Sequence, residues 1–258
     1  MATVFAAPGP VTLPIAGSDL RFPVRRIFCV GRNYAEHSRE MGGDPTREAP
    51  FFFTKPADAV VESGATIPFP PKTADLHHEA ELVVALGRGG IDVSLEDAPA
   101  LIWGHAAGND LTRRDLQAEA KAARRPWDMA KGFDNSAIIG ALVQGPLADA
   151  PITCTVDGHV TQSARLSDMI WSVPEIIAHL SGYVALCPGD LIFTGTPAGV
   201  GALLRKAGVQ AVEAAIIRLS IIPACPPPSE PCAPWPSASL PCSCWPPRRC
   251  ESAGGAPC

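Results

Sequence analysis

The sequence lacks the features that mark membrane, secreted and nucleic-acid-binding proteins. No apolar run reaches the roughly 18 residues that a membrane-spanning helix needs, so no membrane partner is expected. The first residues have no positive segment followed by an apolar core, so no secretory signal is expected and the cytoplasm is the predicted location. Basic residues are not in excess either. The formal net charge of -5 argues against nucleic acid as the main partner, because nucleic acid rewards basic patches.

What is present fits a globular protein. The 258 residues are 47% hydrophobic and 18% charged, which is enough to build one sizeable core. Three cysteines, Cys29, Cys154 and Cys187, stand alone in apolar surroundings and are expected to be reduced and buried. Six more crowd between Cys225 and Cys258. Such a cluster is typical of disulfides in secreted domains, but nothing here predicts export.

Two acidic residues interrupt an apolar segment that otherwise predicts a buried strand. Leu82 to Leu86 is core-like, and alternate residues of a strand point to the same face, so Glu79 and Glu81 are expected to point the same way. Two carboxylates at the edge of a core repel each other and lose hydration, so they need a cation or a proton. A solvated edge strand is the plainer interpretation of such a pair.

A third carboxylate strengthens the metal hypothesis. Asp110 ends a small-residue strand predicted over residues 102–109, where a helix is expected to begin. Three oxygen ligands suit Mg²⁺ or Mn²⁺ better than Zn²⁺, which favours histidine and cysteine. Of the neighbouring histidines only His77 shares the face of the glutamates, and a role beside the ligands or toward substrate is favoured over ligation.

Three further segments carry possible functional groups. His37 and Glu40 lie three apart in a helix predicted over residues 32–41, so the carboxylate can hold the imidazole in one tautomer, although surface pairs at this spacing are common. The glycine-rich turn after a strand over 189–193 can bring backbone N–H groups and the Thr196 hydroxyl close to an anion. Lys131 lies among apolar neighbours in a predicted loop and strand, where a lysine can also simply extend to solvent.

These residues belong to motifs that together resemble the fumarylacetoacetate hydrolase family. The motifs are VGRNY at 30–34, Glu79-Ala80-Glu81 with Asp110, and TGTPAGVG at 194–201. The resemblance extends from roughly residue 20 to 204 and is greatest to the branch of fumarylpyruvate hydrolases and acylpyruvases. It implies a mixed α+β fold, mainly a β roll with short helices at the rim, and a homodimer.

The resemblance also implies roles for individual residues. Glu79, Glu81 and Asp110 would hold the metal; His37, oriented by Glu40 on a mobile lid, would activate water. The remaining assignments are Lys131 as oxyanion stabiliser and Arg114, Gln117 and Thr196 as substrate-binding residues. Thr112 is expected to cap the charged helix over 113–121 that carries Arg114 and Gln117, although most charges of that helix can equally be solvated.

The implied reaction is hydrolysis of a carbon–carbon bond in a 1,3-diketo acid such as fumarylpyruvate or another acylpyruvate. An isomerase or decarboxylase of oxo acids on the same fold is the alternative, and an inactive protein with an incomplete core is another. The sequence predicts a terminal segment over 1–24, a catalytic domain over 25–204 and an aberrant tail over 205–258. Residues 223–258 contain 11 prolines and 6 cysteines, a composition that a shifted reading frame would explain and that disfavours helix and central strand.

Overall fold

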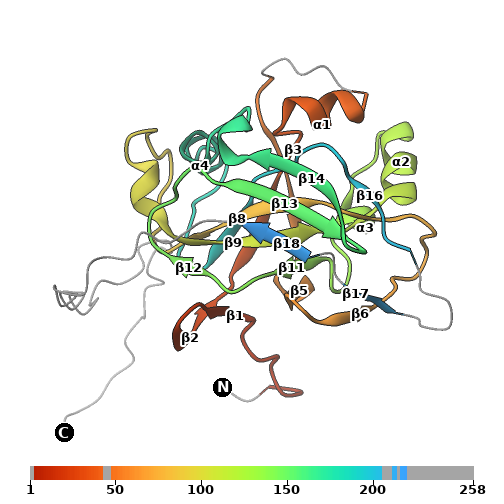
Figure 1. The fold of residues 1–258 in the computed structure, drawn as a ribbon. Helices are drawn as coiled ribbons and strands as arrows, with labels where there is room; N and C mark the ends of the chain where they lie inside the picture. Colours follow the sequence, from red (N-terminus) through yellow and green to blue (C-terminus); the bar gives the residue numbers. More distant parts are fainter. Residues whose placement is uncertain (1–2, 43–47, 205–210, 214–215, 220–258) are drawn as a thin grey trace, which may run out of the picture. The chain divides into compact units, whose positions relative to one another are not determined.

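The computed structural model describes residues 3–42, 48–204, 211–213 and 216–219 (Figure 1). The chain divides into one unit of residues 1–223 and a second of residues 224–258, and the second lies outside the described residues. In the described part, no helix is both long and apolar enough to cross a membrane.

A mixed eight-stranded sheet forms the centre of the first unit. Seven of its strands follow the order β4-β3-β15-β8-β9-β11-β5, and β12 pairs with β9. Only the β3–β15 and β11–β5 pairs are parallel. The strands are β3 (Arg26–Gly31), β4 (Phe51–Lys55), β5 (Val60–Glu62), β8 (Ala80–Leu86), β9 (Ile102–Asp110), β11 (Ala137–Ile139), β12 (Val143–Gln144) and β15 (Asp190–Phe193).

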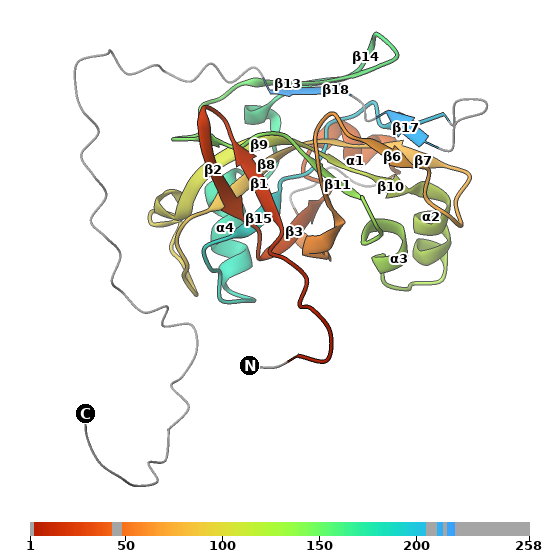
Figure 2. The same cartoon turned by 90° about the horizontal axis from the view of Figure 1, so that it is seen from below.

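Four smaller sheets surround this one. The sheet β14-β13-β18 lies as a separate layer over one face of the central sheet (Figure 2). Its strands are β13 (Pro151–Val156), β14 (His159–Arg165) and β18 (Ile216–Leu219). The others are β1 (Thr12–Ile15) with β2 (Ser18–Pro23), β7 (Leu76–His78) between β10 (Thr112–Arg113) and β16 (Gly201–Ala202), and β17 (Ala211–Glu213) with β6 (Thr66–Pro68).

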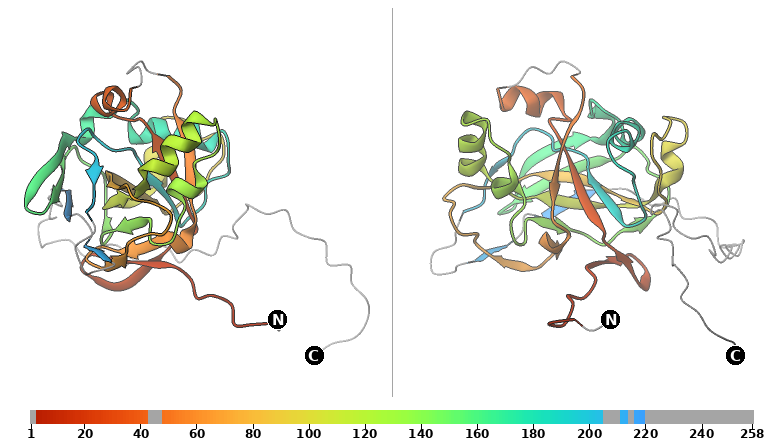
Figure 3. Two further views of the ribbon diagram at one scale, coloured as in Figure 1. Left: turned by 90° about the vertical axis from the view of Figure 1, so that its right-hand side faces the viewer. Right: turned by 180° about the vertical axis from the view of Figure 1, so that it is seen from behind.

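The helices are short and lie around the sheets (Figure 3). They are α1 (Ala35–Glu40), α2 (Arg114–Ala122), α3 (Asp128–Lys131) and α4 (Val173–Ser181), with the 3-10 turns η1 (Ala57–Ala59), η2 (Ala98–Leu101) and η3 (Leu166–Asp168). The mixed α+β class predicted from the sequence, mainly β with short helices, is confirmed.

Strand β8 lies between two apolar clusters, and all seven of its residues are buried. Leu82 and Val84 belong to a cluster that β13 and α4 cover. Val83 and Ala85, on the opposite face, join a cluster covered by β1 and β2. The alternation expected for this segment is therefore present, and burial on both faces explains why it contains no polar residue after Glu81.

The structure corrects several predicted boundaries. Helix α1 begins only at Ala35, because Arg32 has a left-handed φ of 57° that cannot continue into a helix. Thr112 does not cap α2: Arg113 takes the N-cap position, and the Thr112 hydroxyl instead donates to the Asp110 carbonyl. Lys131 ends the helical turn α3 rather than lying in a strand.

Two strands follow Leu204, where the sequence analysis places the end of the catalytic domain. Strand β17 pairs with β6, and β18 pairs with β13, so sheet pairing continues to residue 219. The rest of the predicted tail, with its six cysteines, lies outside the described residues. The other three cysteines are buried free thiols, as predicted.

Candidate metal and active site

The three predicted metal ligands converge at the end of the β8–β9 pair. Glu79 lies in the single-residue break between β7 and β8, Glu81 is on β8, and Asp110 is the last residue of β9. Antiparallel pairing sets Ala80 opposite Asn109, and the Asp110 N–H donates to the Glu79 carbonyl at 2.9 Å. One carboxylate oxygen from each residue lies within 4.8 Å of the others, and all three residues are buried.

Three cations compensate two of these carboxylates. Lys131 Nζ donates to Glu79 Oε2 and to Asp110 Oδ2, both at 2.8 Å. Lys55 Nζ forms an ion pair with Asp110 Oδ1 at 2.8 Å, and Arg114 Nη2 donates to Glu79 Oε1. Lys55 is buried, and its ammonium group lies against Asp110.

Glu81 differs from its two neighbours because no cation in the described residues lies within ion-pair distance of it. Its Oε2 accepts one hydrogen bond, from the Gly195 N–H at 2.7 Å. Burial, with Asp110 and Glu79 nearby, raises the pKa of Glu81 well above its ordinary value of 4.5. Burial also acts to raise the pKa of Glu79, but Lys131 and Arg114 hold it well below 4.5.

This charge distribution fits a divalent cation. A buried carboxylate without a cationic partner must take up a proton or gain a positive charge. Glu81 is in that position, and oxygens of Glu79 and Asp110 lie within reach of the same ion. An all-oxygen set of this kind suits Mg²⁺ or Mn²⁺, which agrees with the site predicted from the sequence.

One face of α2 borders the site. Arg114 Nη1 donates to Gln117 Oε1 at 2.6 Å, and both residues line the pocket together with Lys121 one turn later. Lys121 is not among the site residues predicted from the sequence, although its spacing of four from Gln117 predicts the same helix face. His77 Nδ1 accepts a 3.3 Å bond from Arg114 Nε, so His77 lies beside Arg114 rather than at the carboxylate triad.

His37 and Glu40 form the pair predicted from their spacing. His37 is 6% exposed, and its Nδ1 lies 3.1 Å from Glu40 Oε2. Because a carboxylate only accepts, Nδ1 carries the proton and Nε2 is left as an acceptor. Burial lowers the pKa of His37 below 6.5, against the opposing effect of Glu79 and Glu40, so the ring is neutral at pH 7. The Gly199 N–H donates to Glu40 and ties α1 to the glycine-rich loop.

The glycine-rich loop places Thr196 at the pocket. Gln162 of β14 donates from Nε2 to Thr196 Oγ1 at 2.7 Å and to the Pro197 carbonyl at 2.8 Å, while its Oε1 accepts from the Ala80 N–H at 2.9 Å. Since Thr196 Oγ1 already accepts this bond, its hydroxyl hydrogen is left to donate. Gly195 needs its positive φ of 96° and lacks room for a side chain, because a Cβ there would come within 2.6 Å of Asn33 Cβ.

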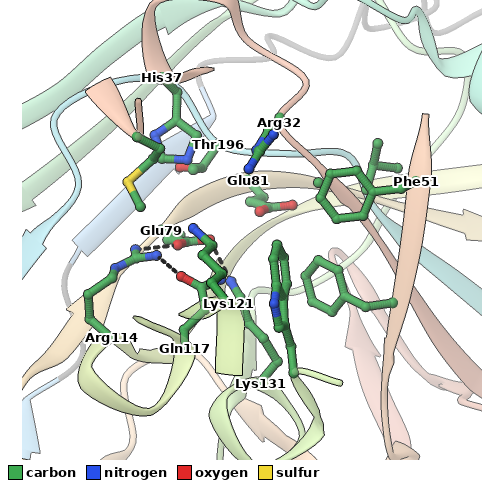
Figure 4. Close-up of a pocket in the computed structure, with 15 residues that line it drawn as sticks. Arg32, His37, Phe51, Glu79, Glu81, Arg114, Gln117, Lys121, Lys131 and Thr196 are labelled. Atoms are coloured by element: carbon green, nitrogen blue, oxygen red, sulfur yellow. Dashed lines mark hydrogen bonds and ion pairs between the residues drawn. The ribbon is translucent and has the colours of Figure 1, made fainter. Parts of the chain in front are cut away.

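The predicted site residues that line one pocket are shown in Figure 4, where His37 and Thr196 lie on one side of the two glutamates and Arg114, Gln117 and Lys131 on the other. Asp110 is fully buried and is not among the residues that line the pocket. The pocket also has walls that the sequence analysis did not predict. They are formed by Arg32, Met41, Phe51, Phe53, Lys121 and Trp127.

A rolled sheet with a buried tricarboxylate centre beside a histidine–carboxylate pair defines a class of metal-binding α+β proteins. The chain belongs to the fumarylacetoacetate hydrolase family: residues 26–224 match the model of the fumarylacetoacetate (FAA) hydrolase C-terminal domain.

Relatives within this family carry several activities in their names. The chain is 47% identical over 164 residues to a fumarylpyruvate hydrolase of a Ralstonia species, covering 62% of this chain and 85% of the relative. It is 40% identical over 199 residues to a mitochondrial oxaloacetate tautomerase of Arabidopsis thaliana, covering 76% and 87%. A crystal structure of fumarylpyruvate hydrolase from Pseudomonas aeruginosa in complex with Mn²⁺ and pyruvate matches with a TM-score of 0.77 and 51% identity, covering 79% of this chain and 91% of that one.

Proposed function

We propose that this protein is a divalent-metal-dependent hydrolase that cleaves the carbon–carbon bond of a 1,3-diketo acid, with fumarylpyruvate as the first candidate substrate. The observation that carries the proposal is that His37, which contacts Glu40, lines one pocket together with Glu79 and Glu81 of the buried carboxylate triad. Similarity to fumarylpyruvate hydrolases and to a structure containing Mn²⁺ and pyruvate supports it. The homodimer and the cytoplasmic location expected from the sequence stay predictions.

In the proposed chemistry, some residues bind the metal and the pyruvyl end of the substrate, and others act on water. A divalent cation held by Glu79, Glu81 and Asp110 would supply a Lewis acid for the oxygens of the pyruvyl end. Arg114 and Gln117 would bind the carboxylate of that end, and Thr196 would donate its hydroxyl hydrogen to a substrate oxygen.

The His37–Glu40 pair is the group proposed to activate water. His37 Nε2 would take a proton from water, whose oxygen attacks the distal carbonyl carbon, while Glu40 holds the imidazolium that forms. The bond between that carbon and the central methylene then breaks, its electron pair stays with the pyruvyl part, and a proton completes pyruvate. Two of the three Lys131 N–H donors bind Glu79 and Asp110, which leaves the third for the negative oxygen that develops.

A paired assay separates this function from the nearest rival. Relatives named oxaloacetate decarboxylase, in Dictyostelium discoideum, and oxaloacetate tautomerase favour a second candidate, chemistry on an oxo acid without water attack. We expect purified protein with Mn²⁺ or Mg²⁺ to release fumarate and pyruvate from fumarylpyruvate with a higher kcat/KM than it shows for decarboxylation or tautomerisation of oxaloacetate. The reverse order would refute the hydrolase assignment.

The pH profile tests the role of His37. Because burial lowers the pKa of His37 below 6.5, the neutral base is lost only when the pH falls through that lower pKa. We expect kcat/KM for fumarylpyruvate to be flat near pH 7 and to fall on an acid limb below pH 6.5. Glu40 raises the His37 pKa, so Glu40→Gln should move this limb to lower pH and also reduce the plateau. An unmoved limb in Glu40→Gln would show that another group is being titrated.

A further inference from the structure

Arg32 is a cation at the pocket that has no carboxylate partner among the described residues. It directly follows β3 with a φ of 57°, a left-handed conformation that residues other than glycine adopt at a cost. Its side chain lines the pocket and is exposed. No carboxylate of the described residues lies within ion-pair distance of it, whereas the Arg39 guanidinium on nearby α1 is paired with Glu36.

An aromatic wall holds Arg32 at this position. The Arg32 guanidinium carbon lies 5.9 Å from the centroid of the Phe51 ring. The Phe51 and Trp127 rings meet in a T-shaped contact, with centroids 5.4 Å apart and an interplanar angle of 84°. Gly31 makes room for the Phe51 ring, because a Cβ at Gly31 would come within 1.9 Å of it. The pocket wall leading to Arg32 is therefore aromatic and built by close packing.

The charges of the pocket give Arg32 a different role from Arg114. Lys131, Lys55 and Arg114 each form an ion pair with Glu79 or Asp110. Lys121 lies over the Trp127 ring at 5.3 Å, and neither it nor Arg32 has a carboxylate partner among the described residues. Figure 4 shows Arg32 beside Phe51, on the other side of the pocket from Arg114. A substrate whose one end lies at Arg114 would extend its other end along the aromatic wall toward Arg32.

We propose that Arg32 and the Phe51–Trp127 wall select an acyl group that is planar and ends in a carboxylate, with the guanidinium binding that distal carboxylate. The inference rests on the proposed function and adds the residues that would distinguish the distal end of the substrate. A conjugated acyl chain is planar and can stack on an aromatic ring. Its terminal carboxylate would be the anionic partner that Arg32 does not have among the described residues.

The test compares two substrates that differ only at the distal end. Fumarylpyruvate ends in a carboxylate, and crotonylpyruvate has a methyl group in its place on the same double bond. Arg32→Gln and Arg32→Lys place the same demand on the left-handed backbone, so they differ in charge rather than in strain. We expect Arg32→Gln to reduce kcat/KM for fumarylpyruvate by about 10- to 100-fold, mainly through KM, and to leave crotonylpyruvate within about threefold. Arg32→Lys should retain part of the preference.

Arg39→Gln is the matched control, because it removes an arginine that already has a partner on the surface of α1. It should leave the ratio of the two substrates unchanged. Equal losses for both substrates in Arg32→Gln, or no loss, would overturn the inference while leaving the hydrolase assignment intact.

If the unaltered protein hydrolyses neither compound, the proposed function fails instead. Calorimetric titration of both compounds into Mn²⁺-loaded protein then gives the same comparison without turnover. If Arg32→Gln binds fumarylpyruvate more weakly than the unaltered protein does, with no change for crotonylpyruvate, the role of Arg32 in recognition is supported. If the two proteins bind fumarylpyruvate equally well, that role is refuted.

Discussion

Replacing His37 with alanine is expected to lower kcat for fumarylpyruvate by about 10²- to 10⁴-fold while leaving Mn²⁺ binding intact. The imidazole is the group placed to take a proton from water, with Nδ1 held by Glu40 at 3.1 Å and the ring neutral at pH 7. His37 is not one of the three residues that would hold the ion. Steady-state kinetics and the increase in melting temperature on adding Mn²⁺ measure the two properties separately.

His159→Ala provides a control, since His159 is an exposed histidine on the β13–β14 hairpin. It should retain both turnover and the Mn²⁺-dependent rise in melting temperature. Turnover by His37→Ala equal to that of the unaltered protein would exclude His37 as the base. A variant that had also lost its response to Mn²⁺ would instead indicate a disturbed fold.

Replacing Glu81 with glutamine should abolish the response to metal with little change in the metal-free protein. Without a cation, burial and the two neighbouring carboxylates raise the pKa of Glu81, which favours the neutral acid, and a glutamine amide closely resembles that acid. With a cation, one anionic ligand of three is missing. We expect the unaltered protein to gain roughly 5–10 °C in melting temperature at about 100 times the Kd for Mn²⁺, and Glu81→Gln to gain almost none at the same concentration.

Activity should fall in parallel. Loss of a direct ligand is expected to reduce kcat/KM by more than the 10- to 100-fold typical of an outer hydrogen-bond partner, and chelator should have the same effect on the unaltered protein. Glu36→Gln, which changes an exposed glutamate on α1, should keep both the temperature shift and the activity. A Glu81→Gln protein with full activity, or an enzyme indifferent to chelator, would refute the metal site.

Local patterns in the sequence were sufficient to predict some of the contacts in the site. The His37–Glu40 spacing predicted their contact because both residues belong to one short helix, whose geometry depends on few neighbours. The same holds for Arg114 and Gln117 on α2. The common direction of Glu79 and Glu81 follows from strand alternation, and the approach of Asp110 was predicted as a third ligand from its place at the end of a second apolar strand.

Contacts between distant segments could not be read in this way. Lys55 pairs with Asp110 across 55 positions of the chain, and Gln162 reaches both the metal-ligand segment and the Thr196 loop; neither residue lies in a pattern that marks it. The start of α1 was predicted wrongly for a similar reason. Arg32, which precedes the helix, has a left-handed backbone, and its side chain lies over the ring of Phe51, a residue distant in the chain.

The sequence by itself indicated the family through motifs spread along the chain, and the mixed fold followed from that resemblance. Strand alternation and residue type indicated the acidic residues that can hold a divalent ion. Only the tertiary structure decided which carboxylate lacks a cation, which lysines are buried against the other two, and that Arg32 lines the same pocket as Arg114. These properties depend on burial and on charges brought together by sheet pairing, and electrostatic energies change steeply with distance and solvent exposure.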